Sequence, residues 1–348
     1  MKLSVFTADE TQWLDLLAST PHDIYHLPSY LKIEGEFRGA RTELFVVTDG
    51  SNFLATPLIL SPIPATPGEM DASSPYGYAG PICSHTAGLA WVKAAFAILI
   101  QHLRERHVIS LFLRFHPILA FPHEALEEHG AIVTLGETVA MALQRPFDTI
   151  QADIRKGTRY DIRRAQRNGQ VARLDTDWEH LSDFRYIYAS TMARVEARSE
   201  YLFSAQYFDR LRYELAPHVA LWVTTIGDQV AAASLVTERA GIVQYHLSGT
   251  HSDFLELNPT KVLLAGVAQW ANERGNRWFH LGGGLGAQND SLMRFKAGFS
   301  RDRFHYKTGR IIVNPLRFHE LTLGVSGSPD FNLHDAAAFF PPYRGAKG

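Results

Sequence analysis

Apolar and polar positions in the first half of the chain predict a regular order of strands and helices. The predicted elements are a polar helix near Asp9–Ala18, strands over 42–50 and 52–63, a loop rich in Gly, Pro and Tyr over 71–84, a helix over 89–106 and a strand over 109–115. The two strands meet at Asp49-Gly50, a dipeptide typical of tight hairpin turns. This half therefore reads as hairpin, loop, helix and strand.

The second half repeats that order. Its predicted elements are helices over 178–194 and 205–215, a hairpin over 218–238 that turns at Ile226–Gln229, a strand beginning at Gly241 and ending at Leu247, a turn at Ser248-Gly249-Thr250, a helix over 260–274 opened by Pro259, and a strand over 277–284. A shared order of elements predicts a duplicated α/β unit. The predicted fold class is α/β (α+β), with two tandem domains that each hold a mixed, mostly antiparallel sheet flanked by helices. We place the domains at 1–150 and 151–325, followed by a loosely structured tail at 326–348.

Composition is that of an ordinary soluble enzyme. The 348 residues are 46% apolar and 20% charged, with a net charge of −2. Cys83 is the single cysteine, which excludes an intrachain disulfide and fits a reducing compartment. The most apolar window, Leu89–Leu103, is interrupted by Lys93 and is too short to span a bilayer, and no signal peptide is recognisable. We therefore expect a cytoplasmic protein without a transmembrane segment, in which any anion site is local.

One stretch of the chain, 152–173, departs from this neutrality. It carries seven bases against Asp153 and Asp161; the bases are Arg155, Lys156, Arg159, Arg163, Arg164, Arg167 and Arg173. Gly157 and Thr158 favour a helix that begins only at Tyr160 and ends at Asn168, with Gly169 as its stop. The stretch is either a solvated face paired with acids from elsewhere, or an anion site for phosphate on a substrate or RNA. The excess of Arg over Lys favours phosphate slightly, because guanidinium binds phosphate oxygens bidentately.

A second candidate site follows the last predicted strand. Gly282, Gly283 and Gly284 form either a flexible turn or a place where backbone approaches a ligand closely, but match neither a Walker loop nor a dinucleotide fingerprint. Lys296 lies between Phe295 and Phe299. It is either a surface lysine with a buried stem or an ammonium beside a carbonyl that becomes an oxyanion.

Other residues are weaker candidates. Tyr76 and Tyr78, in the Gly/Pro loop, either contact an acceptor or belong to the core. His22 and His26 have the spacing of metal ligands but lack a third ligand nearby, so we predict no metal site. Ser248 is not in a nucleophile elbow. His246, His251 and His280 are typical of strand ends or of a pocket. Asp161 and Asp290 are either acids or substrate contacts or, more commonly, plain surface carboxylates.

Seven short motifs, in this order, carry a family resemblance. They are HLPSYL (26–31), SPYGYAGPI (74–82), TRYDIRRAQRNG (158–169), STMAR (190–194), YHLSGT (245–250), FHLGGG (279–284) and RFKAGFS (294–300). In this set the chain resembles the Fem family of tRNA-dependent aminoacyl transferases, which build peptidoglycan cross-bridges, and the related duplicated GNAT-like acyltransferases. The resemblance implies two GNAT-like domains, with the acceptor near the first domain and the donor on the second. A coiled-coil arm and the Arg/Gln-x-x-Gly-x-Gly/Ala loop of acetyl-CoA enzymes are both absent from the sequence.

The resemblance also implies roles for particular residues. Lys296 would be catalytic and assist at the reacting carbonyl. The predicted substrate-binding residues are Arg159, Arg163, Arg164, Tyr76, Tyr78, Tyr245 and Phe295, and the predicted donor-binding residues are Gly282, Gly283 and Gly284.

The predicted function is an acyltransferase or aminoacyltransferase that forms an amide. It would move a group from an activated carrier, preferably aminoacyl-tRNA, to an amine of a phosphate-bearing acceptor, either of the cell-envelope type or a small metabolite. No cofactor is expected beyond the donor substrate, and contact with a membrane would be peripheral only. Two alternatives stay open: an acyl-CoA-dependent N-acyltransferase acting on a sugar amine or polysaccharide precursor, and a non-catalytic module that binds RNA or an envelope intermediate. The oligomeric state stays open as well.

Overall fold

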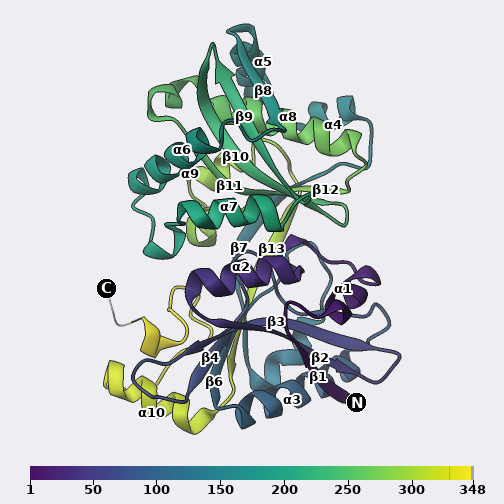
Figure 1. The fold of residues 1–348 in the computed structure, drawn as a ribbon, viewed down its shortest axis with the longest axis vertical. Helices are drawn as coiled ribbons and strands as arrows, with labels where there is room; N and C mark the ends of the chain where they lie inside the picture. The colour runs from purple at the N-terminus through teal and green to yellow at the C-terminus, as the bar shows by residue number, and fades with distance from the viewer. Residues whose placement is uncertain (329, 346–348) are drawn as a thin grey trace. The chain divides into compact units, whose positions relative to one another are not determined.

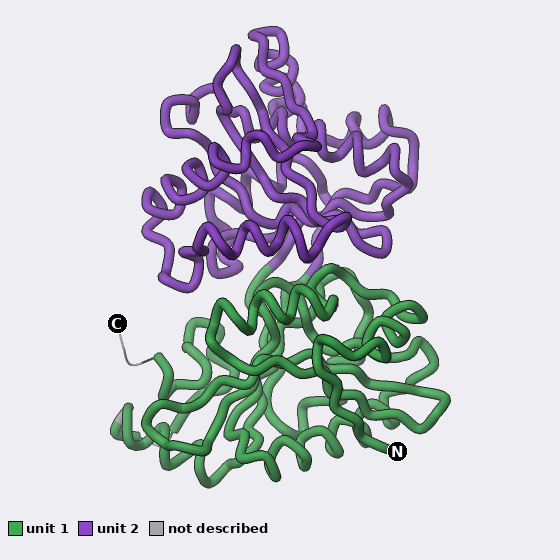
Figure 2. The backbone as a smooth tube through the Cα atoms, in the orientation of Figure 1, with its two compact units in different colours: residues 1–136, 305–348 green, residues 137–304 purple. Residues whose placement is uncertain are grey.

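The computed structural model describes residues 1–328 and 330–345 and divides into two compact units (Figure 2). Unit 1 comprises residues 1–136 and 305–348, and unit 2 comprises residues 137–304. The chain passes from unit 1 into unit 2 within one strand and returns within another. These boundaries differ from a division at residue 150 with a separate tail, and residues 329 and 346–348 of the predicted tail lie outside the described part.

Unit 1 contains the hairpin, helix and strand that the sequence predicts. Its elements are β1 (Lys2–Phe6), α1 (Thr11–Ala18), α2 (Pro28–Arg38), β2 (Arg41–Thr48), β3 (Phe53–Pro62), β4 (Met70–Ser73), β5 (Ile82–Cys83), α3 (Leu89–Glu105), β6 (Val108–Arg114) and α10 (Pro315–Ser326). Strands β2 and β3 pair antiparallel, with Thr48 opposite Phe53 across the Asp49-Gly50 turn. Two strands belong to both units: β7 (Gly130–Ala142) and β13 (Arg303–Ile312).

Unit 2 repeats the arrangement with additional helices. Its elements are α4 (Phe147–Asp153), α5 (Lys156–Arg167), β8 (Gln170–Asp175), α6 (Leu181–Arg194), α7 (Ala205–Glu214), β9 (Val219–Ile226), β10 (Gln229–Arg239), β11 (Ile242–Thr250), α8 (Pro259–Glu273), β12 (Trp278–Gly282) and α9 (Ser291–Lys296). The hairpin predicted at Ile226–Gln229 is confirmed. The predicted turn at Ser248–Thr250 is wrong, because β11 stays paired with β10 through Thr250.

The described strands form one mixed sheet of thirteen strands, which confirms the predicted fold class (Figure 1). The order is β1-β2-β3-β4-β6-β13-β7-β12-β11-β10-β9-β8, and β5 pairs with β3. Each unit contains one parallel pair joined through a helix: β4 and β6 through α3, and β11 and β12 through α8. This parallel pair is the feature that positions the site in unit 2.

Each unit has its own apolar core. In unit 1, α3 buries Val92, Phe96 and Leu99 against the sheet, while Lys93 pairs with Glu128 at 2.5 Å on the exposed side. In unit 2, α8 buries its apolar face in a cluster with β9, β10, β11 and β12. Full burial of one such side chain stabilises a fold by about 1.5–3 kcal/mol.

The described part of the C-terminal segment packs onto unit 1. Phe340 is buried and stacks on Phe318 of α10 at 5.8 Å. Tyr343 donates a hydrogen bond to the buried Asp71 carboxylate at 2.7 Å, and Arg344 donates to the same group at 2.6 Å. A buried carboxylate needs such donors, and in this protein the C-terminal segment supplies them.

Helix α5 begins at Lys156, four residues before the predicted start at Tyr160. Gly157 falls in the first turn, where backbone N–H groups lack intrahelical partners in any case, so glycine costs little there. Thr158 is buried against Gly298, where an added Cβ would lie 2.5 Å from the threonine Oγ1. Tertiary packing therefore sets this helix start. The predicted stop is confirmed, since Gly169 follows the helix with a φ of +82°.

Candidate active site

The parallel pair of unit 2 separates partway along its length. Ile242, Val243 and Gln244 of β11 pair with Trp278, Phe279 and His280 of β12. Strand β11 then continues to Thr250 on the edge of β10, whereas β12 ends at Gly282 on the edge of β7. No further ladder position joins the two strands in the described chain. We call this place the β11–β12 fork.

Lys296, the last residue of α9, places its ammonium at the β11–β12 fork. Only 8% of this residue is exposed. Its Nζ donates a hydrogen bond to the Gly283 carbonyl, just past β12, at 2.7 Å, and lies 5.9 Å from the ring centroid of Tyr245 on β11. Burial lowers the pKa of Lys296 from 10.5 to about 8, against a smaller opposing effect of the Asp290 carboxylate. Lys296 is therefore a buried cation and not a surface lysine with only its stem buried.

The glycine turn is shaped by close contacts with the segment that carries Lys296. Gly282 has a φ of +76°, which favours glycine. At Gly284 an added Cβ would lie 2.1 Å from the Gln288 carbonyl oxygen and 2.4 Å from Asp290 Oδ1. Asp290 caps α9 by accepting the Met293 N–H at 2.8 Å and also accepts the Leu285 N–H at 3.0 Å. Burial acts to raise the pKa of Asp290, but these donors outweigh it and the pKa is lowered.

Tyr245 and Phe295 border the same place from different elements. Burial raises the pKa of Tyr245 to about 12, opposed by a side-chain hydrogen bond with Ser248, so its hydroxyl stays neutral. Phe295 is half-buried and packs edge-on against Phe299 at 5.7 Å. The structure thus brings together Lys296, Tyr245 and Gly283, with Phe295 next to Lys296 along the chain.

Comparison with known proteins identifies this architecture. Residues 152–307 match the family of the acetyltransferase (GNAT) domain. A crystal structure of FemX superimposes with a TM-score of 0.68 at 12% identity, over 91% of this chain and 98% of FemX. The chain has a Fem-like tandem GNAT fold. The predicted resemblance is therefore confirmed at the level of the fold.

Two further structures share this tandem GNAT fold. L-PGS from Bacillus licheniformis gives a TM-score of 0.59 at 14% identity, covering 88% of this chain and 93% of L-PGS. The C-terminal domain of a protein from Agrobacterium fabrum, provisionally named lysylphosphatidylglycerol synthetase, gives 0.57 at 13% identity, covering 88% and 91%. No curated protein matches the sequence significantly.

The arginines of the basic stretch 152–173 in unit 2 do not all reach the fork. Arg159 donates to the carbonyls of Gln151 and Ala152, the last turn of α4. The backbone N–H of Arg155 donates to Gly298 at 2.9 Å, which puts the start of α5 close to Lys296. Arg163 and Arg164 lie two or more turns further along α5, about 12 Å or more along the helix axis. The structure therefore does not bring them to the Lys296 ammonium.

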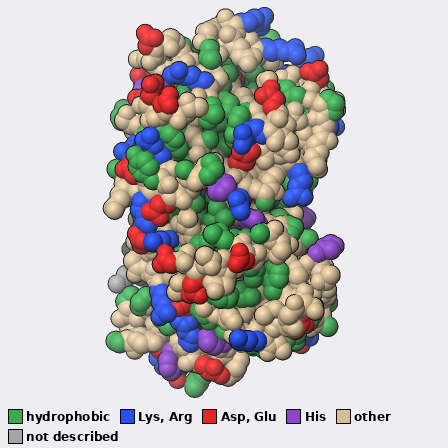
Figure 3. All heavy atoms as spheres, turned by 45° about the vertical axis from the view of Figure 1, so that its right-hand side comes forward, with side chains coloured by type: hydrophobic (Ala, Val, Ile, Leu, Met, Phe, Trp, Pro, Cys, Tyr) green, Lys and Arg blue, Asp and Glu red, His purple; other side chains and the backbone are tan. Residues whose placement is uncertain are grey.

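The two acids of the basic stretch are paired with bases from outside it. Asp153 pairs with Arg145 and Asp161 with Lys261, both at 2.6 Å. Arg163 and Arg164 are exposed and make no ion pair within the described residues. Lys and Arg side chains (blue) gather in Figure 3 at the end of unit 2 where Figure 1 places α5. This face of α5 keeps its positive charge, as an anion site would require.

Tyr76 and Tyr78 belong to a buried polar network in unit 1. The Tyr76 N–H donates to Glu34 at 3.2 Å. The Tyr78 ring packs edge-on against Tyr25, His116 and Tyr306 at 5.3–5.9 Å. Both rings are half-buried, which fits a core role and leaves part of each ring exposed.

His22 and His26 bond to nearby backbone and have structural roles. His22 Nδ1 bonds to the Thr20 carbonyl at 2.8 Å. His26 accepts the Asp23 N–H at 3.2 Å through Nδ1 and bonds to the Gly80 carbonyl at 3.1 Å through Nε2. Within residues 1–328 and 330–345 no group of three or more His, Cys, Asp or Glu side chains is placed to hold a metal ion. The same described residues include no helix long and apolar enough to cross a bilayer.

Sequence reasoning missed one residue that organises the interior of unit 1 and one that shapes the fork of unit 2. In unit 1, Asp23 is fully buried and bonds to His116 Nε2 at 2.9 Å, and no local pattern marks that pair. Asp290 organises the glycine turn and α9. A capping signal could have identified it, since Asp before a short helix is a preferred N-cap.

Proposed function

We propose that this protein transfers an aminoacyl or acyl group from an activated carrier to an amine, and that the reaction takes place at the β11–β12 fork. The observation that carries the proposal is the buried Lys296 ammonium between the end of β12 and Tyr245. Buried cations without a carboxylate partner are rare in cores and are typical of functional sites. The Fem-like tandem GNAT fold supports this reaction class.

The Lys296 ammonium has the properties that an oxyanion donor needs. With a pKa of about 8 it is mainly charged at neutral pH. An ammonium has three N–H donors, and among the described residues the Nζ of Lys296 has one hydrogen-bond acceptor, the Gly283 carbonyl. A donor fixed in a dry site stabilises a developing oxyanion by about 2.7–4 kcal/mol. A separate protein base is not required, because the leaving oxygen of an ester donor can accept the proton of the attacking amine.

Aminoacyl-tRNA is the preferred donor in this proposal. The segment between β11 and α8, residues 251–258, contains no glycine and carries Asp253 and Glu256. Helix α8 begins with Pro259, which lacks an N–H group. These features disfavour a diphosphate at this helix N-terminus, where anions often bind. Because charged tRNA is a cytoplasmic substrate, the proposed reaction is cytoplasmic.

An acyl-CoA donor is the second candidate. The match of residues 152–307 to an acetyltransferase family favours it. In that case the CoA diphosphate would have to bind somewhere other than the start of α8.

The acceptor in this proposal is an amine that carries phosphate. The unpaired charge of Arg163 and Arg164 supports an anionic partner. The name of the Agrobacterium protein supports a phospholipid as one class of phosphate-bearing acceptor. Contact with a membrane would then be peripheral.

A donor assay tests the proposal. The purified protein is incubated with charged total tRNA or with an acyl-CoA panel, each together with an acceptor pool from cell extract, and loss of the acyl group is followed for each donor. We expect deacylation of aminoacyl-tRNA that depends on the acceptor. In Lys296→Ala the rate should fall by about 10²–10³-fold, while Arg294→Ala, an exposed change on the same helix, should retain it.

Other outcomes separate the alternatives. Consumption of acyl-CoA alone would establish the second candidate. Salt-sensitive RNA binding without turnover of any donor would establish a non-catalytic binding module. Full activity of a correctly folded Lys296→Ala would contradict the assigned role of Lys296.

A further inference from the structure

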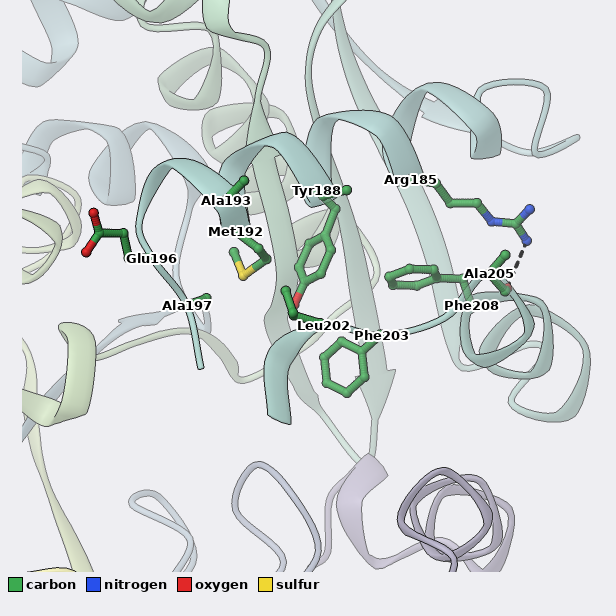
Figure 4. A pocket seen from close by; sticks show the side chains of 11 residues that line it. Arg185, Tyr188, Met192, Ala193, Glu196, Ala197, Leu202, Phe203, Ala205 and Phe208 are labelled. Carbon is green, nitrogen blue, oxygen red and sulfur yellow. Dashed lines mark hydrogen bonds between the residues drawn. The ribbon is translucent and has the colours of Figure 1, made fainter. Parts of the chain in front are cut away.

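A cavity of about 430 Å³ lies in unit 2 between α6 and residues 202–208 (Figure 4). Its walls are mainly carbon and include Tyr188, Met192, Leu202, Phe203 and Phe208. The volume falls in the range of about 300–1,000 Å³ that is usual for small-molecule sites. Below we call it the α6 cavity.

The charged side chains of the α6 cavity are directed away from its centre. Figure 4 shows Arg185 turned toward Ala205, to whose carbonyl it donates at 3.1 Å, and Glu196 pointing outward at the opposite end. Leu202 is 54% exposed at the rim. The chemistry of the α6 cavity therefore favours an uncharged apolar group.

Helix α6 connects the α6 cavity to β11. Thr250, at the end of β11, donates its N–H to Thr191 Oγ1 at 3.3 Å, and its carbonyl accepts from Arg194 at 3.4 Å. Met192 and Ala193, between these two residues, line the α6 cavity. Thr250 is roughly 16 Å beyond Tyr245 at about 3.3 Å per strand residue. A ligand that spans both places would therefore be extended.

Helices α6 and α8 cover opposite faces of the unit 2 sheet. Neighbouring residues on a strand, such as Ser248 and Gly249, face opposite sides. Gly249 lies against α6, since an added Cβ would be 2.7 Å from Thr191 Oγ1. Gly266 of α8 lies against Trp222, which aligns across β10 with Ser248. The α6 cavity therefore lies on the face opposite to α8.

Lys296 approaches the fork from the α8 face. Tyr245 pairs with Val236, which shares its face with Ser234 and Ser248. The Tyr245 ring packs against the cluster that contains the buried residues of α8, and the Lys296 ammonium lies over that ring. Two reactants that meet at the fork can therefore approach from opposite faces of the sheet.

We propose that the α6 cavity binds the apolar part of the amine acceptor, on the face of the sheet opposite to the donor. This inference rests on the transfer reaction proposed above. It adds that the acceptor is an extended amine with an uncharged apolar group, such as a hydrocarbon chain, remote from the reacting nitrogen.

Methionine methyl groups allow binding to be measured without turnover. The chain has five methionines, and among them Met192 lines the α6 cavity, Met293 lies on α9 near Lys296, and Met70 lies in unit 1. With carbon-13-labelled methyl groups, titration with hexylamine should shift the Met192 signal saturably and leave Met70 unchanged. Ethanolamine, which lacks an apolar chain, should leave Met192 in place.

A variant that fills the α6 cavity identifies the binding site. Ala189 is exposed on α6 and lines the α6 cavity, so Ala189→Phe should weaken hexylamine binding about tenfold or more without disturbing the core. Ser182→Phe, an exposed change on the same helix outside the α6 cavity, is the matched control. A Met192 signal that does not respond to hexylamine, or a response that Ala189→Phe leaves unchanged, would overturn the inference whether or not transfer is observed.

Turnover then distinguishes acceptor from donor as the occupant. If the acceptor occupies the α6 cavity, Ala189→Phe should raise KM for apolar amines about tenfold or more with every donor and leave kcat near the wild-type value. An effect confined to donors with large apolar acyl groups would overturn the assignment to the acceptor.

Discussion

The two parallel strand pairs, one in each unit, end in different ways. In unit 1 the chain beyond β4 stays bonded to β6: the Ser74 N–H donates to Phe112 at 2.8 Å, and Arg114 donates to Ser74 Oγ at 3.1 Å and to the Ser74 carbonyl at 2.7 Å. Gly80 then packs against the end of β6, where an added Cβ would lie 2.7 Å from the Arg114 carbonyl oxygen. In unit 2 the corresponding pair opens at the fork, and a buried lysine lies there.

Under the proposed function, this difference means that one topology serves two purposes. Backbone groups without partners are costly inside a protein, so the closed pair of unit 1 is the arrangement that favours stability. The open pair of unit 2 ends its ladder early and holds a desolvated cation, which the proposed reaction would use. Unit 1 would then supply structure, and unit 2 chemistry.

The strongest test exchanges the buried cation for an apolar side chain of similar length. The folded-state pKa of Lys296, about 8 against an ordinary 10.5, corresponds to a destabilisation of about 3 kcal/mol at neutral pH. We expect Lys296→Met to abolish transfer and to raise the free energy of unfolding by about 2–3 kcal/mol at pH 7 in urea titrations. The cost is fully present below pH 8 and disappears as pH approaches 10.5, so the gain should shrink by pH 10. A less stable variant at pH 7 would refute this account of the fork.

The dependence of transfer on pH tests whether the charge at the open strand pair of unit 2 takes part in the reaction. Loss of the Lys296 proton above pH 8 removes the oxyanion donor, so kcat should fall about tenfold per pH unit on the alkaline side. Lys296→Arg keeps its charge, and its profile should show no such decrease below pH 10. Rates measured from pH 6 to pH 10 would decide the matter. A decrease shared by both proteins would assign the titrating group elsewhere.

A substitution at the closed strand pair of unit 1 should lower the stability of the protein and leave turnover nearly unchanged, the opposite of the Lys296 variants. Arg114→Met removes the bond to the Ser74 carbonyl and the contact of the guanidinium with the Phe112 ring at 4.8 Å. We expect a loss of about 1–2 kcal/mol in the free energy of unfolding, with turnover within about twofold of wild type. Chemical denaturation and the transfer assay measure both quantities. A loss of turnover comparable to that of the Lys296 variants would show that unit 1 takes part in the chemistry.

The smallest effect is expected on the exposed face of α5. Arg163→Ala should raise the KM for the acceptor by about three- to tenfold at low salt. The difference in KM between the variant and the wild type should become smaller at higher salt, because salt screens the charge. Arg301→Ala, another exposed arginine of unit 2, serves as the control. Equal effects of the two variants would mean that α5 contributes only to net charge.

Local signals in the sequence predicted much of the fold. The Asp49-Gly50 turn and the Ile226–Gln229 turn marked both hairpins, and helical spacing marked α3 and α8. Strands β7 and β13 were not predicted, because their pairing joins segments far apart in the sequence. Helix α2 was missed as well. It contains Gly35, a poor helix former, which lies so close to Thr42 that a larger side chain would collide with it.

The site was predictable in part only. The resemblance pointed to Lys296 as a candidate, but the burial of this lysine depends on the separation of β11 from β12, which no local pattern records. The bond of Arg159 to the end of α4 was equally hidden, since Arg159 at the start of the stripe looks the same as Arg163 within it. Charge spacing predicts a cationic helix face, but it does not show which arginines of that face are hydrogen-bonded within the protein.

The path of the chain between the units has a consequence for how the protein is made. Strand β13 completes the edge of β6 in unit 1, yet it follows all of unit 2 in the sequence. During synthesis, unit 2 is therefore whole before unit 1 has its last strand, and the usual precedence of N-terminal domains on the ribosome is reversed. Unit 2 is in effect an insertion in unit 1. Its two ends lie in the neighbouring strands β7 and β13, so unit 2 must bring these ends together before the sheet of unit 1 is complete.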